Sequence, residues 1–287
     1  MSVQKIAVIG GGTMGSGIAL TAAINDLQAV VVDISDDQLS RAATYHKKQL
    51  ARAVAKERMT QEEADTALQN LSYVTNMKDA SDADWAVEAA TENIDVKKAI
   101  FKQMFETFGK ETVLATNTSS ISITDLASSV PEATNRVIGM HFFNPVPVMK
   151  LVEVIKGRET SDETTAATLT LSQRMGKTPV PANDFAGFVS NRVLMPMINE
   201  AFHAWTDGVA EPEDIDSIMK LGCAFPMGPL RLADYIGLDV CRDIMMVMYN
   251  GLDKNPKYLP NKKLVELVEQ GHLGDKSGQG VYGYNKG

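Results

Sequence analysis

The first half of this chain alternates continuous apolar runs with stretches of helical periodicity, and this alternation limits the folds open to it. Apolar runs rich in β-branched residues predict strands that are buried on both faces. Helical stretches between them predict crossover connections, and therefore a doubly wound, mainly parallel α/β sheet. The predicted strands are KIAVIG (5–10), AVVVD (29–33), DWAVEA (84–89), TVLATN (112–117), RVIGMHF (136–142) and KLVEVI (150–155).

The pattern changes after about residue 183. The segment TPVPANDFAG (178–187) has two prolines and a glycine, and it is interpreted as a hinge. Beyond it, apolar residues recur at helical spacing from Phe188 to Trp205. Helices are predicted near 14–25, 36–58, 60–70, 93–107 and 161–175, and beyond the hinge near 211–221, 229–250 and 260–270. We therefore expect an α/β domain over 1–183 and a smaller all-helical domain over 184–287.

Composition excludes several classes of protein. The 287 residues carry a net charge of −8 and the pI is about 5.1, which argues against general affinity for nucleic acid or an anionic membrane. No apolar run is long enough to span a bilayer, and the start MSVQKIAVIGGG lacks the parts of a signal peptide. The two cysteines, Cys223 and Cys241, form no disulfide framework and no metal-ligand cluster, so reduced thiols in a cytoplasmic protein are expected.

The first predicted strand runs into a glycine-rich turn. In KIAVIGGGTMGSGIA, the residues Gly10, Gly12 and Gly15 satisfy the pattern G-x-G-x-x-G between a strand and a helix. The first glycine permits a tight turn, the second lets a pyrophosphate approach the backbone, and the third lets helix and strand pack closely. The helix N-terminus then offers N–H groups to the phosphates. This context predicts a Rossmann-type dinucleotide-binding site.

The second predicted strand ends in Asp33, where a carboxylate can accept hydrogen bonds from the hydroxyls of an adenosine ribose. The alternative is an ordinary exposed acid at a strand end. Ile34 and Ser35 supply no cation for a 2′-phosphate, and the carboxylate would repel one. NAD is therefore favoured over NADP, although Arg41 could fold over the site.

Polar residues follow the later strands, at the carboxyl ends where open α/β sheets bind ligands. They are Glu88, Glu92, Asn117–Ser120 and His141–Asn144. Glu153 stands inside the apolar run KLVEVI, where burial without a partner would be costly. His141, on a neighbouring predicted strand, is an available partner, and such a pair beside a nicotinamide could carry a hydroxyl proton during hydride transfer. The alternatives are a core histidine with a satisfied hydrogen bond and a solvent-facing glutamate on an edge strand.

Motifs along essentially the whole chain resemble the L-3-hydroxyacyl-CoA dehydrogenase family, and within it the stand-alone bacterial 3-hydroxybutyryl-CoA dehydrogenases. The motifs are IAVIGGGTMGSGIA, TEN…VKK (91–98), ATNTSSISIT (115–124), GMHFFNPVPVMKLVEVI (139–155), GFVSNR (187–192), KLGCAFPMGPLRLADYIGLD (220–239) and GDKSGQGVYGY (274–284). The resemblance implies an NAD-dependent oxidoreductase that interconverts (S)-3-hydroxybutyryl-CoA and acetoacetyl-CoA.

The resemblance also implies roles for individual residues. His141 matches the catalytic histidine and Glu153 the acid that orients it, while Ser119 and Asn191 match the residues that hydrogen-bond the 3-oxygen of the substrate. The alternatives are that Ser119 only caps a helix starting near Ile121 and that Asn191 only caps or pairs within its own helix. The implied cofactor contacts are Gly10, Gly12, Thr13, Met14, Gly15, Asp33, Glu92, Lys97, Ser119, Asn144 and Lys276.

The predicted helix 36–58 carries Lys48, Arg52 and Lys56 four residues apart, and so on one face. Such a cationic stripe suits the 3′-phosphate of CoA, and the resemblance places CoA on this helix with Lys56 at a matching position. The alternative is a solvated helix face. Gln49 stands where some relatives have a serine, so that contact is not carried over.

The resemblance further implies a homodimer formed through the helical domain. Two other functions stay open from the sequence. One is a related two-domain dehydrogenase that acts on a free hydroxy acid or sugar acid. The other is a crystallin-like protein that binds NAD without catalysis.

Overall fold

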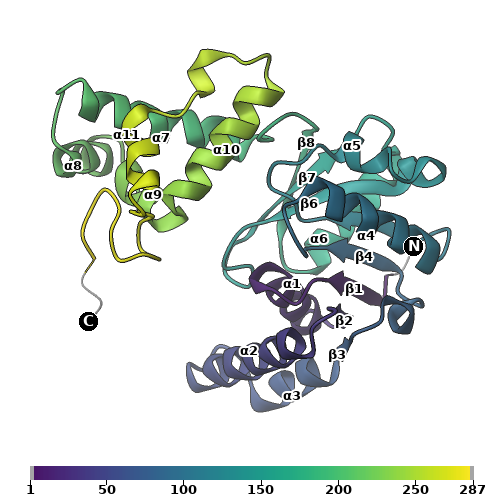
Figure 1. Ribbon diagram of the computed structural model, residues 1–287. Helices are drawn as coiled ribbons and strands as arrows, with labels where there is room; N and C mark the ends of the chain where they lie inside the picture. The colour runs from purple at the N-terminus through teal and green to yellow at the C-terminus, as the bar shows by residue number, and fades with distance from the viewer. Residues whose placement is uncertain (1–2, 285–287) are drawn as a thin grey trace. The chain divides into compact units, whose positions relative to one another are not determined.

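A computed structural model describes residues 3–284, and the chain divides into two compact units, Met1–Asp184 and Phe185–Gly287. The boundary lies one residue beyond the one predicted from the sequence. Figure 1 shows an α/β unit followed along the chain by a unit made of helices. Each unit is described by itself below.

The α/β unit is built on one eight-stranded sheet with the order β3-β2-β1-β4-β5-β6-β7-β8. Its strands are β1 (Lys5–Ile9), β2 (Gln28–Val32), β3 (Leu71–Val74), β4 (Trp85–Glu88), β5 (Val113–Thr116), β6 (Val137–Phe142), β7 (Leu151–Lys156) and β8 (Thr178–Asn183). Every neighbouring pair is parallel except β6 and β7, which run antiparallel. The predicted doubly wound, mainly parallel sheet is therefore confirmed.

Two strands were not predicted. β3 is short, and only its first residue is fully buried, so it has no continuous apolar run. β8 lies within the segment interpreted as a hinge, and that interpretation is wrong for residues 178–183. Its residues Pro179 and Pro181 pair in register with Val152 and Val154 of β7. Proline is tolerated there because β8 is an edge strand, on which a missing N–H can face away from the ladder.

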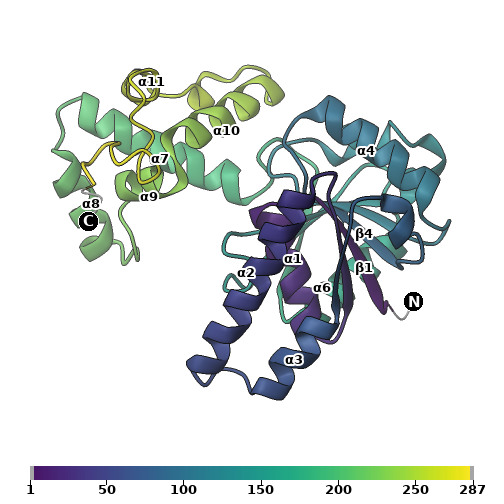
Figure 2. The same ribbon diagram turned by 60° about the horizontal axis from the view of Figure 1, so that its bottom comes forward.

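Helices cover both faces of the sheet (Figure 2). They are α1 (Thr13–Ile24), α2 (Asp36–Ala55), α3 (Gln61–Gln69), α4 (Ile94–Thr107), α5 (Ile123–Ala127) and α6 (Asp162–Arg174). Residues of α1 and α6, among them Ile18 and Leu171, share one apolar core with the side chains of Val31 and Val154 on the strands. α3 begins with the predicted capping box, in which Thr60 and Glu63 bond each other's backbone N–H.

The second unit consists of helices around a separate apolar core, to which Met195, Phe202, Leu238 and Met248 belong. The helices are α7 (Ser190–Thr206), α8 (Pro212–Gly222), α9 (Pro229–Ile236), α10 (Leu238–Gly251) and α11 (Lys262–Glu269). The single helix predicted over 229–250 is broken at Gly237, whose φ of +107° favours glycine and interrupts the helix. Within residues 3–284, no helix combines the length and apolar character needed to cross a membrane.

Candidate active site

The glycine turn between β1 and α1 has the geometry of a phosphate-binding loop. Gly10 has φ +106°, and a Cβ there would lie 2.6 Å from the Cα of Ala90. A Cβ on Gly15 would lie 1.8 Å from the carbonyl oxygen of Gly10, so neither position accepts a side chain. At Gly12, by contrast, nothing lies within 4 Å of an added Cβ. This open space at the start of α1 fits a dinucleotide pyrophosphate, which the helix N-terminus attracts.

Asp33 follows β2 and is tied to this turn. Its carboxylate accepts hydrogen bonds from the backbone N–H of Gly11 at 2.8 Å and of Ser35 at 3.0 Å. Arg41 donates instead to the side-chain oxygen of Gln38, at 2.6 Å from Nη2. The carboxylate therefore stands at the strand end beside the glycine turn, while the guanidinium of Arg41 is held by a neighbour on its own helix.

His141 and Glu153 are brought together by the antiparallel pairing of β6 and β7, which places the two residues directly opposite each other. His141 Nδ1 lies 2.7 Å from Glu153 Oε2, and both side chains are buried. The imidazole also lies against Phe143, with 4.6 Å between ring centroids. A buried carboxylate opposite one ring nitrogen fixes the orientation of the ring and favours a proton on Nδ1.

Ser119 lies in the turn after β5, and Glu92 holds this turn. The Glu92 carboxylate accepts hydrogen bonds from Thr118 Oγ1 at 2.7 Å, the Ser119 N–H at 2.8 Å and Ser120 Oγ at 3.0 Å. The Glu92 side chain is 46% exposed, and its other carboxylate oxygen lies 3.5 Å from the buried ammonium of Lys97. The structure thus gives Glu92 a direct part in shaping the turn that carries Ser119.

Lys97 lies beneath that turn rather than on the surface, with its side chain only 1% exposed. Its ammonium is 2.5 Å from the buried carboxylate of Glu88 and 3.5 Å from that of Glu92. Glu88 also accepts from Thr116 Oγ1 at 2.7 Å and from the Ala90 N–H at 2.8 Å. The lysine expected to contact the cofactor is therefore an internal support of the Glu92 turn in this structure.

Comparison with known proteins assigns the chain to a family. Residues 5–185 match the family described as 3-hydroxyacyl-CoA dehydrogenase, NAD binding domain, and residues 187–284 match the C-terminal domain of the same enzymes. The chain belongs to the 3-hydroxyacyl-CoA dehydrogenase family. It is an NAD-dependent oxidoreductase, and the α/β unit is its NAD-binding domain.

Relatives and solved structures match the dehydrogenase over its full length. The probable 3-hydroxybutyryl-CoA dehydrogenase of Bacillus subtilis is 48% identical over 286 residues, which is 100% of this chain and 99% of the relative. The 3-hydroxybutyryl-CoA dehydrogenase of Clostridioides difficile is 44% identical, covering 99% of this chain and all of the relative. A crystal structure of (S)-3-hydroxybutyryl-CoA dehydrogenase from Ralstonia eutropha has a TM-score of 0.97 at 47% identity, covering 99% of this chain and all of that one.

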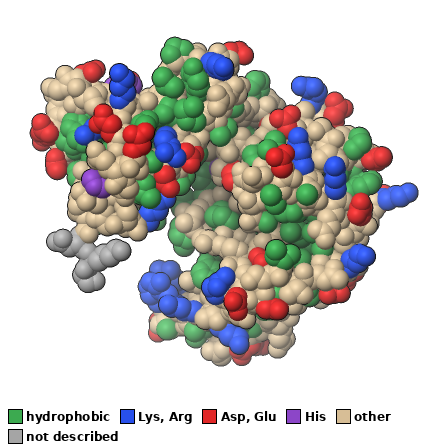
Figure 3. Space-filling model, viewed as in Figure 1, with side chains coloured by type: hydrophobic (Ala, Val, Ile, Leu, Met, Phe, Trp, Pro, Cys, Tyr) green, Lys and Arg blue, Asp and Glu red, His purple; other side chains and the backbone are tan. Residues whose placement is uncertain are grey.

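The NAD-binding unit of the dehydrogenase also carries a cationic groove on the α2–α3 hairpin. A cavity of about 430 Å³ is lined by Arg52, Lys56 and Arg58, and by Pro147 and Val148 from the loop after β6. Figure 3 shows Lys and Arg side chains gathered at the end of this hairpin. Lys48, the third member of the predicted stripe, does not line the cavity. Arg58 does line the cavity, although the sequence pattern did not single it out. The chain leaves the helix after Ala55, so Arg58 does not follow the four-residue spacing of the predicted stripe.

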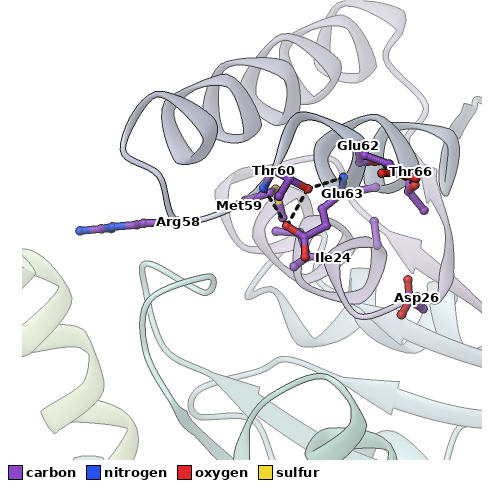
Figure 4. Close-up of a pocket in the computed structure, with 10 residues that line it drawn as sticks. Ile24, Asp26, Arg58, Met59, Thr60, Glu62, Glu63 and Thr66 are labelled. Carbon is purple, nitrogen blue, oxygen red and sulfur yellow. Dashed lines mark hydrogen bonds between the residues drawn. The ribbon is translucent and has the colours of Figure 1, made fainter.

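A second cavity, of about 580 Å³, lies next to the groove and shares Ile24, Arg58 and Met59 with it. Three acidic residues, Asp26, Glu62 and Glu63, line this cavity. Figure 4 shows that Glu63 is turned toward Thr60, while the Arg58 side chain points away from the other labelled residues. Glu63 is engaged in the capping box of α3, so it serves the helix rather than a ligand. Neither cavity contains the His141–Glu153 pair.

The remaining predicted residues lie outside this groove. Asn144 is exposed in the loop after β6. Asn191 is in the first turn of α7, in the helical unit. Lys276, in the same unit, donates a 2.7 Å hydrogen bond to Asp239. Among residues 3–284, no group of three or more His, Cys, Asp or Glu side chains could hold a metal ion.

Proposed function

We propose that this enzyme interconverts (S)-3-hydroxybutyryl-CoA and acetoacetyl-CoA with NAD as the hydride carrier. The names of full-length relatives at 44–48% identity support this substrate, as does the solved structure at a TM-score of 0.97. The observation that carries the chemistry is the 2.7 Å contact between His141 Nδ1 and Glu153 Oε2. It supplies a buried proton carrier on the carboxyl end of a strand, where such folds hold their substrates.

The proton transfer follows from the donor and acceptor types of the pair. An ionised carboxylate only accepts, so Nδ1–H of His141 donates to Glu153, and Nε2 presents its lone pair. Nε2 then takes the proton of the 3-hydroxyl group, and the Glu153 carboxylate stabilises the imidazolium that forms. In the reverse direction the imidazolium returns this proton to the 3-oxygen. Bound NAD supplies the hydride acceptor, and Gly10, Gly12 and Asp33 would hold it.

The 3-oxygen of the substrate gains negative charge when the ketone is reduced, and hydrogen-bond donors stabilise that charge. We assign this role to the hydroxyl of Ser119, which stands on the turn that Glu92 holds. Asn191 is proposed as a second donor, contributed by the helical unit. The roles of Lys276 and Asn144 in cofactor binding stay predictions, as does that of Lys97, whose burial favours a supporting role.

The CoA moiety is assigned to the groove of the α2–α3 hairpin. Arg52, Lys56 and Arg58 line it, and their charges suit the phosphates of CoA. Pro147 and Val148 add an apolar lining from the loop after β6, and Val148 is 70% exposed. Lys48 does not line the groove, so it would interact with the CoA phosphates only through long-range electrostatic attraction.

We also propose that the enzyme is a cytoplasmic homodimer that associates through the helical unit. Val209, Ile218 and Leu221 of that unit are 74%, 61% and 87% exposed. Ile218 and Leu221 are three residues apart in α8 and so lie on one face of that helix, and exposed apolar side chains on one face are typical of a protein interface. The sedimentation behaviour of the purified enzyme tests this association.

The decisive experiment measures oxidation of NADH and NADPH with acetoacetyl-CoA and with free acetoacetate. We expect rapid turnover of the thioester with NADH, and much slower turnover with NADPH because Asp33 repels a 2′-phosphate. A higher rate with the free acid would favour a hydroxy-acid dehydrogenase. Binding of NADH without any turnover of either substrate would favour a non-catalytic, crystallin-like protein, and either result would overturn the proposal.

A further inference from the structure

Lys177, between α6 and β8, is a buried cation that the proposed chemistry does not use. It is 8% exposed. Its ammonium donates hydrogen bonds to the backbone carbonyls of Val146 and of Met149, the latter at 2.9 Å. No carboxylate within residues 3–284 forms an ion pair with it. Burial lowers the pKa of Lys177 below its usual value.

The two carbonyls belong to the loop that follows β6 and forms the apolar wall of the CoA groove. Within this loop the N–H groups of Val148 and Met149 both donate to the carbonyl of Pro145. The side chain of Val146 is buried, and its Cβ lies 2.8 Å from the position that a Cβ on Gly17 of α1 would occupy. The buried side chain of Val146 and the ammonium of Lys177 thus anchor the loop to the interior. Pro147 and Val148 line the groove.

We propose that Lys177 is a positioning residue for the acyl-CoA substrate, because its ammonium fixes the Pro147–Val148 wall of the groove opposite Arg52 and Lys56. This inference rests on the proposed function, which assigns the groove to CoA. The ammonium never touches the substrate. It ties two carbonyls of one exposed loop to the interior, and so keeps the wall at a constant distance from the cationic helix.

The chemistry of the site supports a positioning role over simple packing. Burying an ammonium costs free energy that an apolar side chain of similar length would not cost. What the ammonium adds is two charge-assisted hydrogen bonds, which are stronger than neutral ones. Both go to the carbonyls at 146 and 149, which lie on either side of the two residues that line the groove.

The test compares Lys177→Met with Lys150→Met in the full-length enzyme. Methionine keeps the length of the side chain but removes the donors and the charge. Lys150 is an exposed lysine at the end of the same loop, so its replacement removes one charge near the groove without touching the anchor. For Lys177→Met we expect the KM for acetoacetyl-CoA to rise about tenfold, which corresponds to about 1.4 kcal/mol of binding free energy. The kcat and the KM for NADH should stay within about twofold, and Lys150→Met should resemble wild type.

Salt separates positioning from direct attraction of phosphates. Because Lys177 is buried, the ratio of KM values between Lys177→Met and wild type should be the same at low and high ionic strength. A ratio that shrinks with salt, or an equal rise in KM for Lys150→Met, would mean that charge alone matters and would overturn the proposal. An unchanged KM in a folded Lys177→Met enzyme would overturn it as well.

A second measurement covers the case in which Lys177→Met does not fold. Lys177→Gln keeps an amide donor, and we expect a smaller rise in KM together with faster hydrogen exchange of the Val148 and Met149 amides. Unchanged exchange and unchanged KM in this variant would contradict the inference. Failure of the proposed function is distinguishable, since wild type itself would then not turn over acetoacetyl-CoA, whereas failure of this inference leaves wild type active.

Discussion

The NAD-binding unit holds two buried histidines, His46 on α2 and His141 on β6, and their surroundings differ in one respect. His46 is fully buried, with Nδ1 at 2.7 Å from the hydroxyl of Tyr73 and Nε2 at 2.8 Å from the carbonyl oxygen of Ser16. A carbonyl only accepts, so Nε2 carries the proton and Nδ1 accepts from Tyr73. Burial raises the pKa of Tyr73 to about 12, so its hydroxyl remains a donor.

His141 faces a carboxylate instead of a carbonyl and a hydroxyl. A carboxylate stabilises the ring in its protonated form, whereas the neutral partners of His46 do not, and burial lowers the pKa of His46 despite its hydrogen bond to Ser16. Burial alone therefore does not distinguish a proton carrier from a core histidine. The charge of the hydrogen-bond partner distinguishes the two histidines, and the following variants test this difference.

The largest effect is expected at His141. His141→Gln removes the proton carrier, and we expect kcat for acetoacetyl-CoA reduction to fall about 10²–10⁴-fold, the usual contribution of general acid–base catalysis. The KM for NADH should change little, because the glycine turn and Asp33 are untouched. The matched control is His46→Gln, the same replacement at the other buried histidine, which should keep the wild-type kcat. Full turnover by His141→Gln, or equal losses in both variants, would contradict the assignment.

A smaller effect is expected when only the partner of His141 is changed. Glu153→Gln replaces the carboxylate by a neutral amide and makes the surroundings of His141 resemble those of His46. We expect kcat to fall about tenfold to a hundredfold, which corresponds to the loss of one charged hydrogen bond. Glu153→Asp keeps the charge on a shorter side chain and should recover part of this rate. Steady-state assays of both variants decide the matter, and equal losses in the two would show that the charge is not what counts.

The amino-acid sequence indicates the His141–Glu153 pair because two features of it are local. His141 ends a continuous apolar run and Glu153 interrupts the next one, so both residues fall on predicted strands and are candidate partners, while their roles were implied only by the family resemblance. The sheet was predictable for the same reason. The edge strands β3 and β8 were not, because one is short with a single fully buried residue and the other contains Pro179 and Pro181.

The parts that the sequence did not indicate depend on distant contacts. Lys97 stands next to Lys98 in a helical pattern, and nothing local tells that its ammonium is buried against Glu88. Arg58 follows the end of α2, so helical spacing cannot place it beside Arg52. Lys177 bonds to carbonyls, which every residue carries, and such partners leave no signal in the sequence.

The smallest effect is expected at His46, and it concerns stability rather than rate. In the folded state burial keeps this ring neutral, and its pKa lies below the ordinary value of 6.5. Below about pH 6.5 the unfolded chain takes up a proton at this residue, whereas the folded chain takes it up only at a lower pH. Proton uptake by the unfolded state lowers the free energy of unfolding, by at most about 1.4 kcal/mol for each pH unit between the two pKa values.

His46→Gln isolates this contribution, because glutamine can donate to Ser16 and accept from Tyr73 but does not titrate. At about pH 7.5 the variant should be somewhat less stable than wild type, and on lowering the pH to about 5.5 this deficit should shrink or reverse. Urea unfolding followed by Trp85 fluorescence in a Trp205→Phe background measures the NAD-binding unit alone. All other titrating groups cancel in the difference between the two proteins. If the stability difference between His46→Gln and wild type stays constant with pH, His46 is protonated equally in the folded and unfolded states. The contrast between His46 and His141 would then not lie in the charge of the hydrogen-bond partner.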